Sequence, residues 1–172
     1  KINTILVTGG TGYIGSHCVV SLIKKGFRPI IIDNFSNSYP NVIKKIELIT
    51  RKKIIYYNID LSDKRNLRKV FKKHKFYSVI HCAGYKAVSE SIEKPVAYFN
   101  NNVGSTLSLL DCMEENRIFK IIFSSSATVY NENSSILKEN GKIGKTKNPY
   151  GNTKYIIERI LTDLAKYDNR WC

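Results

Sequence analysis

Cysteine, proline and long apolar runs are all scarce in this chain of 172 residues. The four cysteines are widely spaced and form no C-x-x-C pair, so the sequence predicts neither a zinc site nor a disulfide framework. No apolar run approaches the roughly 20 residues needed to cross a bilayer. The first residues also lack the long apolar region of a secretory signal. We therefore expect a cytoplasmic protein with no metal and no membrane partner.

Acidic residues are also few: 14 Asp and Glu stand against 28 Lys and Arg, which gives a formal net charge of +14. A face that concentrates positive charge attracts the phosphates of nucleic acids. Here the lysines fall in short, scattered clusters, mostly where we expect polar helix faces or turns, so we expect no specific nucleic-acid partner. The clusters are residues 24–25, 44–45, 51–53, 72–75 and 142–147.

The chain does contain a regular alternation of apolar runs and amphipathic segments. The runs rich in Ile and Val predict strands, each buried on both faces, over 4–8, 29–33, 54–59, 78–83 and 120–125. The amphipathic segments predict helices over 13–25, 40–50, 62–74, 95–115 and 149–167. This alternation implies an α/β fold, a doubly wound parallel sheet with helices on both faces, in one domain over 1–172. Ligands bind such sheets beyond the carboxyl ends of the strands.

A glycine turn follows the first expected strand, in the stretch TGGTGYIGSH over 8–17. Gly9, Gly12 and Gly15 stand where the strand must turn into a helix. Glycine tolerates the backbone angles of a tight turn, and the missing side chain lets a pyrophosphate approach the backbone amides. The helix that begins there adds unpaired N–H groups and the positive end of a dipole. The turn therefore predicts a phosphate-binding site.

An acidic residue, Asp33, ends the second expected strand, eighteen residues after Gly15. A carboxylate at this place can accept hydrogen bonds from the hydroxyls of an adenosine ribose, and it repels a 2′-phosphate. Asp-Asn is also a common turn pair, which is the structural alternative. Together with the glycine turn, the acid favours dinucleotide binding, and NAD over NADP.

The stretch NPYGNTK, over 148–154, places a tyrosine and a lysine four residues apart. Residues at this spacing are neighbours on a helix surface. Asn148 and Pro149 favour a helix that starts here, with Tyr150 in its first turn and Lys154 one turn further on. A cation held near a phenol favours the phenolate form, which can act as a base. In isolation the pair is more often an exposed aromatic residue beside a common cation.

These motifs occur in the same order as in a known family. With HCAGYKAVSES (81–91), NNNVGSTLSLL (100–110) and FSSSATVY (123–130), the chain resembles the amino-terminal half of the UDP-glucose 4-epimerases, which are extended short-chain dehydrogenases/reductases. The resemblance runs from about Ile5 to about Tyr167 and implies a Rossmann-type NAD-binding domain. The implied reaction is reversible hydride transfer from C4 of a UDP-hexose to tightly bound NAD, through a 4-keto intermediate.

The resemblance also implies which residues contact NAD. The pyrophosphate would lie on the glycine turn with Tyr13 and Ile14, the adenosine ribose on Asp33 and Asn34, and the adenine beside Asp60 and Leu61. The remaining implied cofactor contacts are Ala83, Gly84, Lys86, Asn101, Ser124, Tyr150 and Lys154.

The fifth expected strand narrows the implied chemistry. Relatives that dehydrate nucleotide sugars place an acidic pair after the serine or threonine, whereas this chain has Ser124, Ser125, Ser126, Ala127 and Thr128. Reversible oxidation without elimination is the better fit. The resemblance makes Tyr150 the base and acid, Lys154 its tuning cation, and Ser126, or Thr128 beside it, the proton relay. The implied substrate contacts are Lys86, Ser126 and Tyr150. On the residues alone, strand-end capping also explains the serines.

The chain ends where the resembling family continues into a further strand and a smaller domain that binds the nucleotide sugar. We therefore expect a fragment without the carboxy-terminal substrate domain. Two alternatives remain: another NAD-dependent nucleotide-sugar epimerase, or a catalytically silent NAD-binding or basic interaction protein. Relatives pair through the long helices expected near 95–115 and 149–167, so a homodimer is a further expectation.

Overall fold

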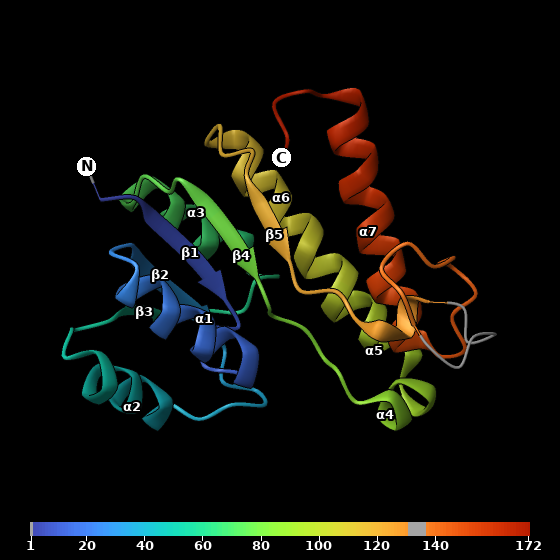
Figure 1. Ribbon diagram of the computed structural model, residues 1–172, viewed down its shortest axis with the longest axis horizontal. Coiled ribbons are helices and arrows are strands. Elements are labelled where there is room, and N and C mark those ends of the chain that lie inside the picture. The colour runs from blue at the N-terminus through green and yellow to red at the C-terminus, as the bar shows by residue number, and fades with distance from the viewer. Residues whose placement is uncertain (1, 131–136) are drawn as a thin grey trace. The chain divides into compact units, whose positions relative to one another are not determined.

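The computed structural model describes residues 2–130 and 137–172 and contains a five-stranded parallel sheet (Figure 1). The strand order is β3-β2-β1-β4-β5, the order of the first five strands in a Rossmann fold. The predicted doubly wound α/β fold is therefore confirmed. The strands are β1 (Thr4–Thr8), β2 (Arg28–Asp33), β3 (Ile55–Asn58), β4 (Ser78–His81) and β5 (Ile121–Phe123).

Helices follow the strands as the sequence predicts, with one addition. The helices are α1 (Tyr13–Lys24), α2 (Asn41–Thr50), α3 (Lys64–Lys73), α4 (Val88–Glu93), α5 (Pro95–Tyr98), α6 (Ser105–Glu115) and α7 (Pro149–Tyr167). A π-helical segment, Phe99–Gly104, joins α5 to α6, and a short 3₁₀ turn spans Ala127–Val129. The predicted helix over 95–115 is thus a continuous run with a π-helical middle. The short α4 had not been predicted, because six residues are too few to show a helical period.

The chain divides into two compact units. The first, called the sheet unit below, comprises Lys1–Ala83, Ser108–Ser124 and Cys172. The second, called the helical unit, comprises Gly84–Leu107 and Ser125–Trp171. The sheet unit contains all five strands, and the helical unit contains α4, α5, α7 and the first residues of α6.

The core of the sheet unit forms where α1 and α2 cover one face of the sheet (Figure 1). Val7 and Ile31, on neighbouring strands, pack there with Val19 of α1 and Ile46 of α2, all at most 2% exposed. Alternate strand residues point to opposite faces, so Leu6 is buried on the side where α3 lies. Burying this apolar surface is the main force that holds the layers together.

The two edge strands differ from the prediction that every strand is buried on both faces. In β3, exposed and half-buried residues alternate, and Tyr56 is 47% exposed. In β5, Ile122 is 64% exposed, although its neighbour Ile80 in β4 packs against the core. Apolar β-branched runs predict strands but do not distinguish a central strand from an edge strand. The prediction is therefore wrong for β3 and β5.

The outer edge of β5 is paired with the last residue of the chain. Cys172 donates a backbone hydrogen bond to Phe119 O (2.8 Å) and accepts one from Ile121 N (2.9 Å). Cys172 thus bonds to the residues before and after Lys120, which is how a residue pairs with a neighbouring parallel strand.

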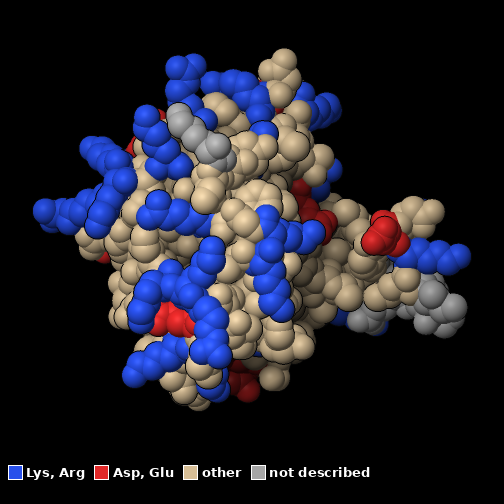
Figure 2. Space-filling model, turned by 60° about the vertical axis from the view of Figure 1, so that its left-hand side comes forward, with Lys and Arg blue, Asp and Glu red and all other residues tan. Residues whose placement is uncertain are grey.

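The lysines of the predicted clusters are exposed, those over 142–147 on the helical unit and the others on the sheet unit. Both members of the 24–25 and 44–45 pairs are exposed, at the end of α1 and on α2. Figure 2 shows Lys and Arg over much of the face it presents, with few Asp and Glu between them. Two cations of α3 are paired, Lys64 with Asp111 and Arg68 with Glu115. Among the described residues, no helix is long and apolar enough to span a bilayer.

The polar stretch NENSSILKENGKIGKTKN, over 131–148, is described only from residue 137. Residues 131–136 lie outside the described part of the chain. The remainder is irregular and makes one isolated antiparallel bridge, between Tyr130 and Ile143. Thr146 donates a hydrogen bond to Asn152 Oδ1 (2.8 Å) and so joins this stretch to α7.

Candidate functional site

The glycine turn lies between β1 and α1, where the sequence predicts it. Gly9 has φ +66°, and a Cβ added to it would lie 2.6 Å from Ala83 N, so conformation and space both require glycine. A Cβ at Gly15 would lie 2.1 Å from Gly9 O, because the first turn of α1 packs directly on the turn. Gly12 precedes the helix without a side-chain cap. The turn therefore brings bare backbone to the start of a helix dipole, an arrangement that suits phosphate.

Asp33 ends β2 beside this turn and is 8% exposed. Its Oδ2 accepts a hydrogen bond from Thr11 N (3.0 Å), and its Oδ1 accepts from Phe35 N (2.9 Å) and Ser38 Oγ (3.1 Å). Asp33 can therefore stabilise the turn after β2 and also accept a hydrogen bond from a ligand. A carboxylate has about four acceptor positions, so the three protein donors leave capacity for a ribose hydroxyl.

Asn34 and Asp60 are joined at the ends of the neighbouring strands β2 and β3. Asn34 Nδ2 donates to Asp60 Oδ2 (2.7 Å), and Ser62 donates to Asp60 Oδ1 through its backbone N–H (2.9 Å) and its hydroxyl (2.6 Å). Burial tends to raise the pKa of the Asp60 carboxyl, but the bonds from Ser62 and Asn34 outweigh it and lower that pKa. Asp60 is therefore a charged group at the carboxyl edge of the sheet.

The other predicted site residues of the sheet unit lie at the same edge. Leu61 is 5% exposed, Ala83 follows β4 next to Gly9, and Ser124 follows β5 with its backbone N–H bonded to His81 O (3.0 Å). All five parallel strands end at this edge, so the fold gathers residues that are far apart in sequence.

The helical unit contains the Tyr-x-x-x-Lys pair at the start of α7. Asn148 caps the helix, with its Oδ1 accepting from Gly151 N (2.7 Å), and Pro149 occupies the first turn. The predicted helix entry is confirmed. Tyr150 is half-buried, whereas Lys154 is only 5% exposed. Lysine side chains are seldom this deeply buried, and this one lies one turn after Tyr150.

Ser126 and Thr128 lie against the same helix start. Ser126 Oγ accepts from Thr128 N (3.2 Å) and Thr128 Oγ1 (3.0 Å), and so caps the 3₁₀ turn. A Cβ at Gly151 would lie 3.1 Å from Thr128 O, so this turn packs closely on the residue after Tyr150. The hydroxyls of Ser126 and Thr128, which were predicted to relay a proton, therefore also cap this turn. Ser125 Oγ is buried without a hydrogen-bond partner in the described structure.

Asn102, in the π-helical segment, connects the remaining site residues of the helical unit. Its Oδ1 accepts from Tyr85 N (2.8 Å) and Asn101 Nδ2 (2.9 Å), and its Nδ2 donates to Tyr85 O (3.0 Å) and Thr153 Oγ1 (3.0 Å). The side chain is 2% exposed with all four positions filled. The predicted residues Gly84 and Asn101 thus lie against one buried amide, and Lys86, which follows Tyr85, is exposed.

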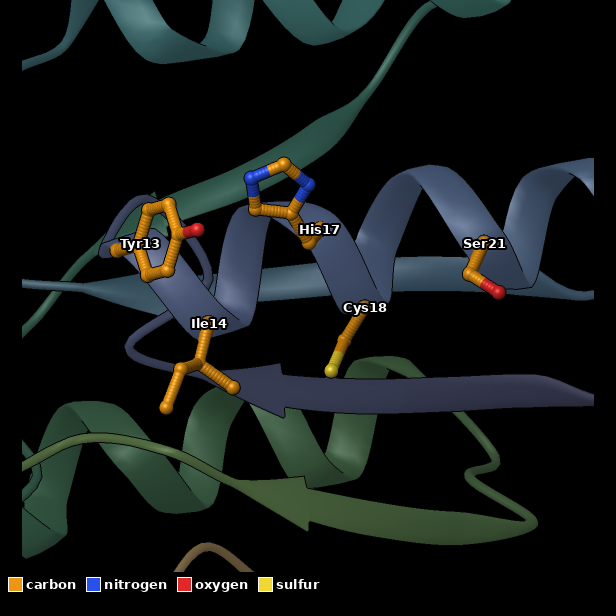
Figure 3. Close-up of a pocket in the computed structure, with 5 residues that line it drawn as sticks. All are labelled: Tyr13, Ile14, His17, Cys18 and Ser21. Atoms are coloured by element: carbon orange, nitrogen blue, oxygen red, sulfur yellow. The ribbon is translucent and has the colours of Figure 1, made fainter.

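A shallow depression of about 420 Å³ follows one face of α1 (Figure 3). It is lined by Tyr13, Ile14, His17, Cys18 and Ser21. The Tyr13 and His17 rings meet edge to face with centroids 5.0 Å apart. None of the five is a Lys or Arg, so the depression carries no cationic side chain.

Some residues that shape the site were not predicted from the sequence. Thr11 and Ser38 bind the Asp33 carboxylate, while Asn102, Thr153 and Tyr98 organise the helical unit. Asn102 lies inside a motif that marks the resemblance, so it could have been considered. The partners of the other four depend on tertiary contacts. Among the described residues, no group of three or more His, Cys, Asp or Glu could hold a metal ion.

A parallel sheet of this order, a glycine turn with a strand-end acid, and a Tyr-x-x-x-Lys helix define a Rossmann-type dinucleotide-binding protein. Residues 5–171 match the model of the NAD dependent epimerase/dehydratase family, and the chain belongs to that family.

Individual relatives agree with this assignment. A UDP-glucose 4-epimerase of Dictyostelium discoideum is 46% identical over 167 residues, which is 97% of this chain and 48% of that protein. The crystal structure of UDP-glucose 4-epimerase from Bifidobacterium longum, in complex with NAD⁺ and UDP, is 43% identical with a TM-score of 0.95, over 98% of this chain and 51% of that one. The UDP-Glc/GlcNAc 4-epimerase of Campylobacter jejuni is 29% identical with a TM-score of 0.91, over 98% and 51%. The chain thus spans about half the length of these relatives.

Proposed function

We propose that this chain is the NAD-binding part of a UDP-glucose 4-epimerase, which interconverts UDP-glucose and UDP-galactose in galactose metabolism. The observation that carries the proposal is the start of α7. There, a buried Lys154 follows Tyr150 by one turn, and the Ser126–Thr128 hydroxyl pair packs against that turn. The relatives named above support the choice of reaction.

The residues present fit NAD. The turn at Gly9 and Gly15 has no room for a Cβ and offers backbone to a pyrophosphate. The Asp33 carboxylate keeps acceptor capacity for ribose hydroxyls, and its charge disfavours the 2′-phosphate of NADP. We assign the adenosine side of the cofactor to the sheet unit, with Asn34, Asp60 and Leu61. We assign the nicotinamide side to Lys86, Asn101, Tyr150 and Lys154.

In the proposed reaction, the Tyr150 phenolate takes the proton of the C4 hydroxyl while a hydride leaves the same carbon. The 4-keto sugar then turns within the site, receives the hydride on its other face, and takes the proton back from Tyr150. Lys154 stabilises the phenolate electrostatically, and Ser126 passes or orients the proton. NAD, when bound, accepts the hydride and returns it, so no net oxidation occurs.

A second substrate class has specific support. The Campylobacter jejuni relative is a UDP-Glc/GlcNAc 4-epimerase, so an N-acetylated UDP-hexose is the other candidate. We propose that most residues that contact the sugar and the uridine lie in the half of the relatives that this chain does not span. We propose that a nucleotide-sugar domain supplies them.

We further propose a homodimer and a cytoplasmic location. Half-buried apolar residues run along α7 at helical spacing, at Ile156, Ile160 and Leu164, and such a stripe suits helix pairing. Sedimentation that shows only monomers at micromolar concentration would count against the dimer. Microscopy of the tagged protein tests the location.

The test of the proposed function has two stages. Nucleotide released by heat from the purified chain is identified and quantified, and we expect NAD at up to one per chain. The chain, together with any residues that its gene encodes beyond Cys172, is then assayed with UDP-glucose and with UDP-N-acetylglucosamine. Absence of NAD, combined with stabilisation by DNA or RNA, would instead favour a silent or basic interaction protein.

A further inference from the structure

The segment that contains Lys86 is fixed on both sides of that residue. On one side, Asn102 accepts from Tyr85 N and donates to Tyr85 O. On the other side, the backbone N–H of Ala87 donates to the hydroxyl of Tyr98 (3.1 Å). The Lys86 side chain is nevertheless exposed. The backbone of this lysine is therefore held in place while its ammonium faces solvent.

Tyr98 ends the four-residue helix α5, and its side chain is fixed by burial, a ring contact and hydrogen bonds. It is 1% exposed, and its ring lies against that of Tyr85 with centroids 5.4 Å apart. Its hydroxyl donates to Glu90 Oε2 (3.0 Å), and Glu90 Oε1 pairs with Lys94 (3.3 Å). Burial, together with the Glu90 carboxylate, raises the pKa of Tyr98 to about 12. The phenol thus keeps its proton for Glu90 and accepts from Ala87 at every working pH.

Packing alone does not account for this arrangement. A phenylalanine at 98 would fill the same space, yet the hydroxyl joins the Ala87 amide to the Glu90 carboxylate in the first turn of α4. The Asn102 side chain fixes the backbone of Tyr85 in the same way, through bonds to its N–H and its carbonyl oxygen. Two buried polar side chains thus converge on the residues either side of one exposed lysine.

We propose that Tyr98, oriented by Glu90, is a positioning residue for Lys86 and acts together with Asn102 so that the ammonium meets NAD in one place. This inference rests on the proposed function, because it needs Lys86 to contact the cofactor. A lysine whose backbone is fixed loses less conformational freedom when it binds an anionic ligand.

The test is a double-mutant cycle on NAD affinity, measured by calorimetry with the chain. Lys86→Ala should weaken NAD binding about tenfold, and Tyr98→Phe three- to tenfold. The double variant should bind as weakly as Lys86→Ala alone, because Tyr98 acts through Lys86. Additive losses, or an unchanged affinity in Tyr98→Phe, would overturn the proposal. Tyr167→Phe, on a 77% exposed tyrosine, is the matched control and should change nothing.

A second variant and a second measurement separate this proposal from the proposed function. Glu90→Ala removes the acceptor of the Tyr98 hydroxyl from a side chain that is 45% exposed, so it should fold and reproduce part of the loss. Amide hydrogen exchange at Ala87 should become roughly tenfold faster in Tyr98→Phe. If the unmodified chain binds no NAD, the proposed function fails. Whether or not NAD binds, unchanged amide exchange at Ala87 in Tyr98→Phe would overturn the positioning role of Tyr98.

Discussion

The Asn102 side-chain amide donates a hydrogen bond to Thr153 Oγ1 at 3.0 Å, and Thr153 donates in turn to the backbone oxygen of Tyr150 at 2.7 Å. Both Asn102 and Thr153 are buried, at 2% and 0% exposure. The π-helical segment and the first turn of α7 are therefore connected through side chains that touch the backbone of the proposed base. The geometry of Tyr150 depends on residues that have no direct role in the chemistry.

Removing this connection should destabilise the helical unit. Asn102→Ala removes the side-chain partner of both Tyr85 N and Tyr85 O, and it removes the donor to the Thr153 hydroxyl, which keeps its own bond to Tyr150 O. We expect the free energy of unfolding to fall by about 2–4 kcal/mol. Urea denaturation measures the change. Asn152→Ala is the control, because that side chain is exposed and, among the described residues, its bond is to Thr146 in the irregular stretch before α7. A loss below about 1 kcal/mol for Asn102→Ala would contradict the structural role.

The glycine turn should tolerate no side chain at Gly9 or Gly15, where an added Cβ would lie closest to the backbone. Gly15→Ala places a Cβ 2.1 Å from Gly9 O, so we expect NAD binding to fall at least tenfold and the midpoint of thermal unfolding to drop. Gly104→Ala is the matched control, because a Cβ there meets nothing within 4 Å. Calorimetry with NAD compares the two. Equal NAD affinity in both variants would show that the turn does not hold the cofactor.

The proposed base can be separated from cofactor binding. In the catalytically active protein that contains this chain, Tyr150→Phe should lower the epimerisation rate by roughly 10²–10⁴-fold, because the proton acceptor is lost. The content of NAD after purification should fall far less than the rate, because Phe keeps the ring at 150 and the other assigned cofactor contacts remain. Lys154→Met should reduce both the rate and the NAD content, since Lys154 is assigned to both tasks. A Tyr150→Phe protein with normal turnover would remove Tyr150 from the mechanism.

Acid should weaken the bond between Asn34 and Asp60. The pKa of Asp60 is lower in the folded chain than its ordinary value of 3.8, so the carboxylate stabilises the fold above about pH 4. This contribution is lost as the pH falls through the folded pKa. Because Asp60 is only partly buried, we expect a difference under about 1 kcal/mol. Comparison of urea unfolding at pH 7 and pH 3 for the chain and for Asp60→Asn tests this, and the variant should lose less stability than the unmodified chain.

The cysteines should react at very different rates. Burial raises the pKa of the Cys112 thiol to about 11, and the residue is fully buried, so both the thiolate fraction and access are low. Cys172 is exposed. With a thiol reagent at pH 8, we expect Cys172 to be labelled first and Cys112 only on unfolding. Mass spectrometry of peptides after timed labelling checks the order.

Much of the fold followed from local pattern. Glycine spacing over 9–15 and Asp33 at a strand end predicted the first βαβ unit, and Asn148 with Pro149 predicted the start of α7. These signals are local, because turns and caps depend on residues within a few positions of one another. The edge strands were predicted less well, since exposure of Tyr56 and Ile122 depends on which strands have neighbours.

By itself the sequence determined the order of elements, the glycine turn, the strand-end acid and the Tyr150–Lys154 pair, since each is encoded by spacing along the chain. Only the tertiary structure decided that Ser38 and Thr11 share the Asp33 carboxylate, and that Asn102 and Tyr98 fix the residues on either side of Lys86. These partners are 5 to 22 residues apart in sequence, and residue types alone do not specify them. Buried polar groups must find hydrogen-bond partners, and folding determines which partners are within reach.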